Sequence, residues 1–157
     1  MDIRRATASD LDAVVAIVES QRRQYQKYQP TFWHKAAGSA ARAKAFFSGL
    51  LTEEQTYFLV STEGNLVLGF LIARKVQAPP VFAPGGDTWL VDDFAVSEPR
   101  HWLSIGEALL SHVSTLLHEH GAAQIVATCA DRDLAKAEVL RRSDLTIASN
   151  WWTKPLR

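Results

Sequence analysis

Two adjacent carboxylates, Asp92 and Asp93, lie in a stretch that is otherwise apolar, residues 88–96. A carboxylate is costly to bury unless it is paired or faces a cleft, so this placement suggests that the acids have a role. An acid in such a position is a candidate general base, which takes a proton from a reacting group. The alternative is that both acids are structural, one of them paired with an arginine elsewhere.

A short distance downstream, residues 101–107 read His-Trp-Leu-Ser-Ile-Gly-Glu and predict a turn that opens a helix. The first turn of a helix leaves backbone amides unpaired, and the helix dipole adds a positive field, so an anion such as phosphate binds well there. A phosphate site beside two acids predicts an enzyme that holds a phosphorylated cofactor next to a proton acceptor. The alternative is that Gly106 merely allows the helix to pack closely.

The composition restricts the class of protein. The chain has 157 residues, 47% of them hydrophobic and 22% charged, which predicts a single globular domain over residues 1–157. Seventeen basic and seventeen acidic side chains cancel, so no overall field draws the protein to nucleic acid or membranes. A single Cys excludes an internal disulfide, and no long apolar segment is present. We expect a cytoplasmic protein with a small-molecule partner.

The hydrophobic spacing predicts an α+β domain. Apolar residues at helical spacing predict helices at about 9–25, 39–51, 103–120 and 133–143, with Ser9 and Asp133 as N-caps. Alternating or continuous apolar stretches predict strands at about 1–6, 55–62, 66–77, 88–96, 122–130 and 146–154. Gly64 indicates a hairpin turn, Gly121 the end of the third helix, and residues 78–87 an irregular loop.

This order of elements resembles that of the GNAT superfamily of N-acetyltransferases across almost the whole chain. The family signature is a strand ending in valine, a short turn, and R/Q-x-x-G-x-G/A opening the long helix. Val96 and Gly106 match it, whereas His101 and Ser104 stand in place of Arg/Gln and the first Gly. The resemblance implies a mixed, mostly antiparallel sheet of six to seven strands flanked by about four helices.

The same resemblance implies acetyl-CoA as the co-substrate. In the family, the amides of the turn bind the pyrophosphate, and the end of the fourth strand hydrogen-bonds the pantetheine arm. The residues that the resemblance assigns to the cofactor are Phe94, Val96, His101, Trp102, Leu103, Ser104, Ile105, Gly106, Glu107 and Asp133.

The acids resemble a further pattern, the L-E-D-x-x-V of the diamine acetyltransferases in this family. By position, Asp92 becomes the base, acting directly or through water, and Asp93 orients the substrate or is structural. Many members also carry N-x-x-A-x-x-x-Y-x-x-x-G-F, in which the Tyr protonates the leaving thiolate. Aligned on Asp133, that pattern places Leu140 at the Tyr and leaves no identifiable general acid.

The acceptor site is expected in the loops that follow the first helix and precede the fourth strand. Tyr28, Phe32 and Trp33 are candidates to line it, because aromatic faces attract amines. The alternative is that Phe32 and Trp33 fill the core. Cys129 is a candidate nucleophile by its place at the end of a strand, but a free cysteine is more often a small apolar filler.

Two other groupings indicate no site. His118 and His120 are two residues apart on a helix and so do not face one metal ion, and we expect no metal. Arg22, Arg23 and Lys27 lie beside tyrosines, but on a neutral protein such a patch indicates a solvated helix end rather than a nucleic-acid site.

Three functions follow from these patterns. The first is an N-acetyltransferase that acts on the amine of a small molecule or of a peptide terminus. The second is a non-catalytic domain that binds acyl-CoA as a sensor, and the third is an interaction protein without a cofactor. A homodimer is also expected as an option, because Trp151 and Trp152 in a strand face opposite sides and one of them then lies at an edge or a dimer contact.

Overall fold

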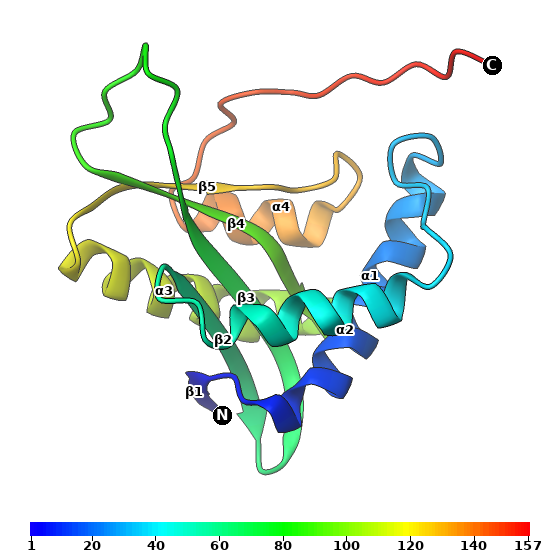
Figure 1. The fold of residues 1–157 in the computed structure, drawn as a ribbon, viewed down its shortest axis with the longest axis horizontal. Helices are drawn as coiled ribbons and strands as arrows, with labels where there is room; N and C mark the ends of the chain where they lie inside the picture. The colour runs from blue at the N-terminus through cyan, green and yellow to red at the C-terminus, as the bar shows by residue number, and fades with distance from the viewer.

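A computed structural model describes residues 1–157 and shows one five-stranded sheet in the order β1-β2-β3-β4-β5 (Figure 1). Neighbouring strands are antiparallel except β4 and β5, which are parallel. The strands are β1 (Asp2–Arg5), β2 (Thr56–Glu63), β3 (Leu66–Val76), β4 (Asp87–Val96) and β5 (Ala122–Ala127). The α-helices are α1 (Leu11–Tyr28), α2 (Ser39–Leu50), α3 (Glu107–Glu119) and α4 (Leu134–Arg142). None of them is both long and apolar enough to cross a membrane.

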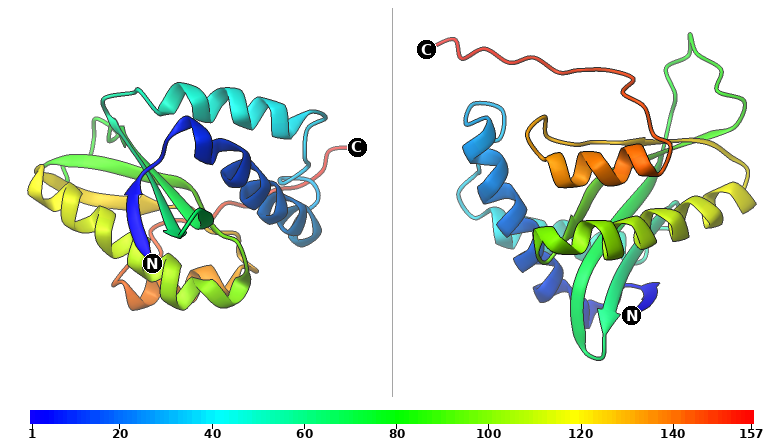
Figure 2. Two further views of the ribbon diagram at one scale, coloured as in Figure 1. Left: turned by 90° about the horizontal axis from the view of Figure 1, so that it is seen from below. Right: turned by 180° about the vertical axis from the view of Figure 1, so that it is seen from behind.

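The helices form two layers, with α1 and α2 on one face of the sheet and α3 and α4 on the other (Figure 2). Each face carries its own apolar core, because alternate residues of a strand point to opposite faces. In β2, for example, Phe58 and Val60 pack beneath α1 and α2, whereas Leu59 between them packs with α3. The middle of the sheet is therefore buried on both faces.

Hydrogen bonds at the N-terminus fix the entry into α1. A turn of 3-10 helix (Ala8–Asp10) precedes the helix, and its N-cap is Thr7 rather than Ser9. The carboxylate of Asp10 accepts from the Thr7 amide at 2.8 Å and from Arg4 at 2.8 and 2.9 Å. The hydrogen bonds from Arg4 in particular lower the pKa of Asp10 to about 2. The helix then continues to Tyr28, three residues beyond the predicted end.

The hairpin at Gly64 and the end of α3 at Gly121 are confirmed, each glycine having a positive φ. The expected sheet of six to seven strands is wrong, because the sheet has five. Residues 146–154 have the composition of a strand, but they pair with no other segment of the chain. Strand composition indicates an extended conformation, whereas a sheet also needs a free edge within reach, which the local pattern does not reveal.

Two element boundaries also differ from the prediction. β5 ends at Ala127 rather than at residue 130. The helix expected from residue 103 begins at Glu107, after a turn of 3-10 helix (Pro99–His101) and a π-helical turn (Trp102–Gly106). Both differences fall at the same end of β4, where the chain must leave the sheet.

Candidate active site

The site is built on an edge of β4 that β5 leaves uncovered. The parallel pairing of the two strands ends at Val91 and Ala127. Thr128 still donates its amide to the Val91 carbonyl at 3.1 Å, but β4 continues alone on this side through residues 92–96. Its other side stays paired with β3 as far as Val96. The predicted acids therefore lie where the sheet opens.

A β-bulge occurs at the two acids. Leu71 of β3 pairs with Phe94 and Ala73 with Val91, so two residues of β4, Asp92 and Asp93, oppose one residue of β3. Val91 and Phe94 consequently contribute to the same core, although they are three residues apart. The strict alternation expected from the sequence does not hold across this bulge, because a bulge shifts the pattern by one residue.

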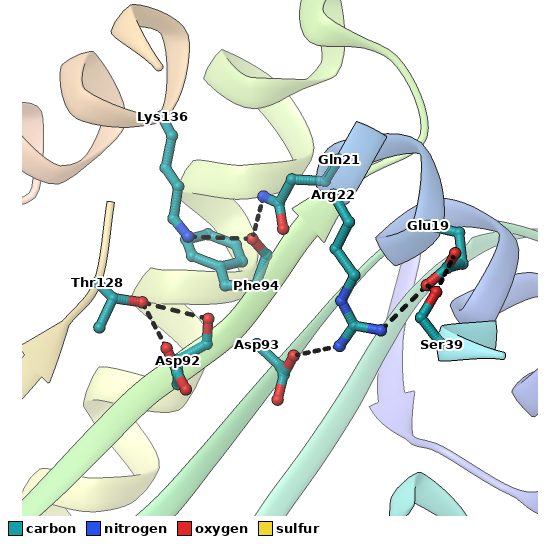
Figure 3. A network of polar contacts seen from close by, with 9 residues as sticks. All are labelled: Glu19, Gln21, Arg22, Ser39, Asp92, Asp93, Phe94, Thr128 and Lys136. Atoms are coloured by element: carbon teal, nitrogen blue, oxygen red, sulfur yellow. Dashed lines mark hydrogen bonds and ion pairs between the residues drawn. The ribbon is translucent and has the colours of Figure 1, made fainter. Parts of the chain in front are cut away.

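The two carboxylates lie in different surroundings (Figure 3). Asp92 is exposed, and its Oδ1 accepts from the Thr128 hydroxyl at 2.7 Å. Asp93 is half-buried beneath α1, where a guanidinium nitrogen of Arg22 approaches its Oδ1 to 3.7 Å. Burial, followed by the charge of Asp92, raises the pKa of Asp93. The pair therefore offers one acid to solvent and keeps behind it a second acid whose proton affinity is increased.

Beyond the acids, the uncovered carbonyl of Phe94 accepts two hydrogen bonds from side chains of opposite layers. Gln21 of α1 donates through Nε2 at 3.0 Å, and Lys136 of α4 donates through Nζ at 3.2 Å (Figure 3). These side chains stand at the edge where a further strand would otherwise pair. The edge is thus bridged by polar groups rather than by backbone.

Lys136 is the functional candidate that the sequence reasoning missed. Its side chain is only 1% exposed, and Nζ lies 5.3 Å from the ring centre of Phe94 and 5.8 Å from that of Trp102. Burial lowers its pKa, against the opposing charges of Cys129, Asp133 and the two β4 acids. The available signal was its position in the pattern aligned on Asp133, because Lys136 stands where that pattern has a small alanine.

Lys136 also has hydrogen-bonding capacity to spare. The Phe94 carbonyl is its one acceptor, whereas a lysine side chain carries two or three N–H groups according to its protonation. A buried donor without an acceptor loses its hydrogen bonds to water and gains none within the protein. The buried Lys136 amine at the open strand edge can therefore donate to a further acceptor atom there.

The turn that follows β4 uses part of its donors internally. The amides of His101 and Trp102 donate to the Glu98 and Pro99 carbonyls, and the amide of Glu107 returns to the turn itself. The amides that remain to be considered for an anion are those of residues 103–106, which form the π-helical turn itself. Within that range Leu103 and Ser104 lie at the surface, whereas Ile105 and Gly106 are buried.

Gly106 has a packing role as well. A Cβ placed on it would lie 2.5 Å from Cε3 of Trp102, a separation that real Cβ atoms do not show. The Trp102 ring in turn packs edge-on against Phe94, with ring centres 4.9 Å apart. The packing explanation of this glycine is therefore correct, and it is compatible with an anion site on the same turn.

The predicted acceptor residues form a cluster around a tyrosine of α1. Tyr28 and Trp33 pack against Tyr25 with ring centres 6.0 and 5.1 Å away, and Phe32 packs edge-on against Trp33 at 4.6 Å. Phe32 is 46% exposed, so it does not fill the core. The cluster lies beside α4, because the Tyr25 hydroxyl donates to Asp133 at 2.7 Å.

Asp133 and Cys129 are engaged within the protein. Asp133 caps α4 as predicted, accepting the Lys136 amide at 3.2 Å in addition to the Tyr25 hydroxyl. The Cys129 thiol points to backbone carbonyls, and burial raises its pKa to about 11. A thiol that stays protonated is a poor nucleophile, which supports the interpretation of Cys129 as an apolar filler.

Hollows elsewhere on the surface do not involve these residues. One of about 440 Å³ lies between the end of β3 and the β3–β4 loop. Another of about 620 Å³ lies between α1 and the segment that leads into α2. Neither is lined by residues 92–106, whereas the β4 edge is occupied by the Lys136 side chain and its aromatic neighbours.

Comparison with known proteins gives consistent findings. Residues 14–142 match the model of the acetyltransferase (GNAT) family. No curated protein matches the chain. Among solved structures, a tetramutant of the BH1408 protein from Bacillus halodurans aligns with a TM-score of 0.84 at 18% identity, covering 99% of this chain and 100% of that one.

Two further structures carry names that state an activity or a ligand. A predicted acetyltransferase with acetyl-CoA from Clostridium acetobutylicum aligns with a TM-score of 0.74 at 14% identity, over 99% of this chain and 96% of that one. A ribosomal-protein-alanine N-acetyltransferase from Brucella melitensis biovar Abortus 2308 aligns with a TM-score of 0.63 at 15% identity, over 100% and 99%. At these identities the likeness establishes the fold.

Proposed function

Because this chain belongs to the acetyltransferase (GNAT) family, we propose that it moves an acetyl group from acetyl-CoA to the amine of a small molecule or a peptide terminus. The observation that carries the proposal is the opening of the sheet at β4. There an unpaired strand edge, two carboxylates and a buried amine meet within a few residues. Amide-bond formation from a thioester needs these three elements: a place for the donor, a proton acceptor and a hydrogen-bond donor for the carbonyl oxygen.

For the cofactor, we assign the pantetheine arm to the backbone of β4 between Phe94 and Val96, the part of the strand that β5 does not cover. We assign the pyrophosphate to the turn, where the amides of residues 103–106 are the candidate donors and the dipole of α3 adds a favourable field. His101, Trp102 and Glu107 then shape the turn rather than donate their amides, since these are already bonded internally.

Lys136 supports this placement through its unused N–H capacity. We assign that capacity to the carbonyl oxygen of the thioester, which gains negative charge as the amine attacks. A donor held in place by Phe94 and Trp102 in a water-poor site stabilises such charge more than a solvated donor does. Removing one donor of this kind typically lowers kcat by about 10²–10³-fold.

Asp92 is the proposed base. The acceptor amine must lose a proton, and Asp92 is the acid of the pair that solvent, and hence a substrate or a bridging water, can reach. Thr128 fixes its orientation through the 2.7 Å hydrogen bond. Asp93, with its raised pKa, lies behind it and adds negative potential that favours the approach of a cationic amine.

The leaving thiolate needs no dedicated acid in this scheme. Leu140 lies where the family pattern has a tyrosine, and a leucine has no proton to give. The Tyr25 hydroxyl is already committed to Asp133. A thiol has a pKa of about 8.5 by analogy with free cysteine, so a thiolate is a tolerable leaving group that water can protonate.

The test is an assay of thiol release from acetyl-CoA over a panel of amines, amino acids and peptides. We expect Asp92→Asn to reduce turnover by about 10²–10⁴-fold, the usual contribution of a general base, while acetyl-CoA still binds. Asp131→Asn is the matched control, because it removes the same charge from an exposed position nearby.

The outcomes separate the candidate functions. Normal turnover in Asp92→Asn removes Asp92 from the mechanism but leaves the acetyltransferase intact. Tight binding of acetyl-CoA without thiol release from any acceptor identifies a sensor domain instead, a role that the leucine at position 140 favours. Ligands that bind the native state raise the melting temperature, so no shift at millimolar acetyl-CoA rejects both functions.

A further inference from the structure

The segment that joins α1 to α2, residues 29–38, carries two of the predicted acceptor aromatics, Phe32 and Trp33. We call this segment the connector. None of its residues is buried, so apolar packing alone does not hold it against the protein. A hollow of about 620 Å³ separates part of it from α1. The position of the connector therefore depends on a few specific contacts.

A buried carboxylate of α1 makes the main polar contacts with the end of the connector. Glu19 is only 6% exposed. Its oxygens accept hydrogen bonds from the ammonium group of Lys35 at 2.7 Å and from the hydroxyl of Ser39, the first residue of α2, at 2.8 and 3.0 Å. The amide of Lys35 also donates to the side chain of Gln26 at 2.7 Å. Glu19 therefore fastens the end of the connector to the middle of α1.

The same carboxylate binds Arg22, one turn further along α1. Nη1 of Arg22 donates to Glu19 at 3.1 Å, whereas Nη2 of the same guanidinium lies 3.7 Å from Asp93 (Figure 3). Burial raises the pKa of Glu19, but the hydrogen bonds from Lys35, Ser39 and Arg22 outweigh burial and lower it. Glu19 is therefore ionised at neutral pH, and it competes with Asp93 for one guanidinium, which lies closer to Glu19.

We propose that Glu19 is a positioning residue of the acceptor site, which fixes the connector against α1 and holds Arg22 back from Asp93. This role rests on the acetyltransferase function proposed above, in which Asp93 attracts the amine and the connector carries the predicted acceptor aromatics. Glu19 acts through Lys35, Ser39 and Arg22 rather than on the reacting atoms. One carboxylate thus links the position of the connector to the charge that meets the amine.

The distance between Arg22 and Asp93 decides how much of the negative charge of Asp93 is available. A guanidinium in close contact with a carboxylate cancels most of its field, so an acid fully paired with Arg22 would attract an incoming cation weakly. Burial, followed by the charge of Asp92, raises the pKa of Asp93, and Arg22 opposes this rise from 3.7 Å. The other charges that oppose it are those of Lys136 of α4 and Arg74 of β3.

Two substitutions should move the titration of Asp93 in opposite directions. Glu19→Gln keeps the size of the side chain but removes the charge that holds Arg22, so the guanidinium can approach Asp93 and the pKa of Asp93 should fall. Arg22→Gln removes the opposing positive charge, so the pKa of Asp93 should rise. NMR of the Asp93 carboxyl carbon as a function of pH measures both. The acid limb of kcat/KM for the amine should move in the same two directions.

Steady-state kinetics with an amine identified by the thiol-release panel tests the hold on the connector. Without the contact between Lys35 and Glu19 the connector opens, and the apparent affinity for the amine falls with the fraction of molecules in which it is closed. We expect KM for the amine to rise about tenfold in Glu19→Gln and Lys35→Met, with kcat changed less than about threefold. KM for acetyl-CoA should stay the same, because Glu19 lies with α1 on one face of the sheet and the turn at Trp102 packs on the other.

Asp12→Asn is the matched control. Asp12 also joins α1 to α2, through an ion pair of 2.6 Å with Lys44, but its side chain is 85% exposed. The substitution should change neither the titration of Asp93 nor KM. Glu19→Asp adds a second comparison, because it keeps the charge and shortens the side chain. If the charge of Glu19 is what matters, Glu19→Asp should keep the Asp93 titration closer to wild type than Glu19→Gln does, whereas a packing role predicts the reverse.

The outcomes that overturn the role of Glu19 are distinct from those that reject the enzyme. An Asp93 titration that stays the same in Glu19→Gln, or that moves in the same direction in Glu19→Gln and Arg22→Gln, would overturn it. So would an equal rise of KM in Asp12→Asn. Circular dichroism checks the fold, and if Glu19→Gln does not fold, Lys35→Met tests the connector and Arg22→Gln tests Asp93.

A wild type that releases no thiol with any amine rejects the acetyltransferase function instead. The role of Glu19 is then decided by the NMR titration of Asp93 and by hydrogen exchange of the Lys35 amide, which is bonded to Gln26 while the connector is closed. Faster exchange of this amide in Glu19→Gln, but not in Asp12→Asn, supports the hold on the connector, and equal exchange in both variants contradicts it.

Discussion

Replacing Lys136 by methionine separates the stability of the site from its activity. Methionine is unbranched and apolar, with a length close to that of lysine, and it fits between the Phe94 and Trp102 rings that now flank Nζ. The Phe94 carbonyl keeps its hydrogen bond from Gln21 at 3.0 Å, so the substitution leaves no buried acceptor unpaired. The change therefore removes a buried amine and little else.

The expected effect on stability follows from the lowered pKa of Lys136, whose main cause is burial. In the unfolded chain the amine keeps its proton up to about its ordinary pKa of 10.5, whereas the folded protein releases it at a lower pH. The cost of burying the cation is therefore complete below the folded pKa, declines as the pH rises, and is gone above 10.5. Each pKa unit between the two states corresponds to about 1.4 kcal/mol.

Methionine lacks this cost at every pH. Replacing a buried ionic group by a well-packed apolar one is neutral or stabilises by about 1–4 kcal/mol, and we expect a gain in this range at neutral pH. For a domain of this size, each kcal/mol raises the melting temperature by about 2–4 °C. The difference between variant and wild type should shrink as the pH approaches 10.5.

Urea unfolding at several pH values from neutrality to just below 10.5 measures this difference. Lys27→Met, at an exposed position of α1, is the control and should show no such pH dependence. A Lys136→Met protein that is less stable than wild type at neutral pH, or that has the same pH dependence, would refute the reasoning. Activity should fall although stability rises: if Lys136 donates to the thioester oxygen, kcat of Lys136→Met should be reduced by about 10²–10³-fold.

Three further outcomes test the surrounding structure. Asp10→Asn should lower the free energy of unfolding, measured with urea at neutral pH, by about 1–2 kcal/mol. This loss should vanish as the pH falls from 3.8 through the folded pKa of about 2, because the wild-type carboxylate is then protonated as well. Gly106→Ala should lower the free energy of unfolding by about 1–3 kcal/mol, because the added methyl group overlaps Trp102. Gly49→Ala, with open space around it, should not have this effect, and a similar loss at both sites would contradict the packing argument. Cys129 should react slowly with alkylating reagents at neutral pH and faster as the pH approaches about 11, and rapid neutral alkylation would show that its thiol is activated.

The sequence located the β4 acids but not their geometry. A carboxylate pair in an apolar strand is visible in the residue types alone, and the strand lies where it was expected. The bulge is not visible, because it depends on how β3 pairs with β4, and a single extra residue changes the face on which each side chain lies. Which acid meets solvent and which meets α1 is therefore a property of the folded sheet.

Lys136 is a second case in which the sequence does not reveal the surroundings of a side chain. A lysine on a helix is expected at the surface, and nothing local in α4 indicates that this one is buried. Its burial follows from the tertiary contact of α4 with the turn at Trp102. The alignment with a pattern that has alanine at this position was the only sign that a long side chain there must enter the core.

In the proposed mechanism, the charged groups around the open edge of β4 favour the amine at one place and acetyl-CoA at another. Asp92 at the surface and Asp93 behind it beneath α1 create a negative potential that suits a cationic amine and repels phosphates. On the buried side, we assign the unused N–H groups of Lys136 to an acyl oxygen and the amides of residues 103–106 to a diphosphate. The bulge between β3 and β4 positions the acids, and the end of the β4–β5 pairing exposes the strand edge, so two neighbouring irregularities of β4 underlie the two proposed binding regions.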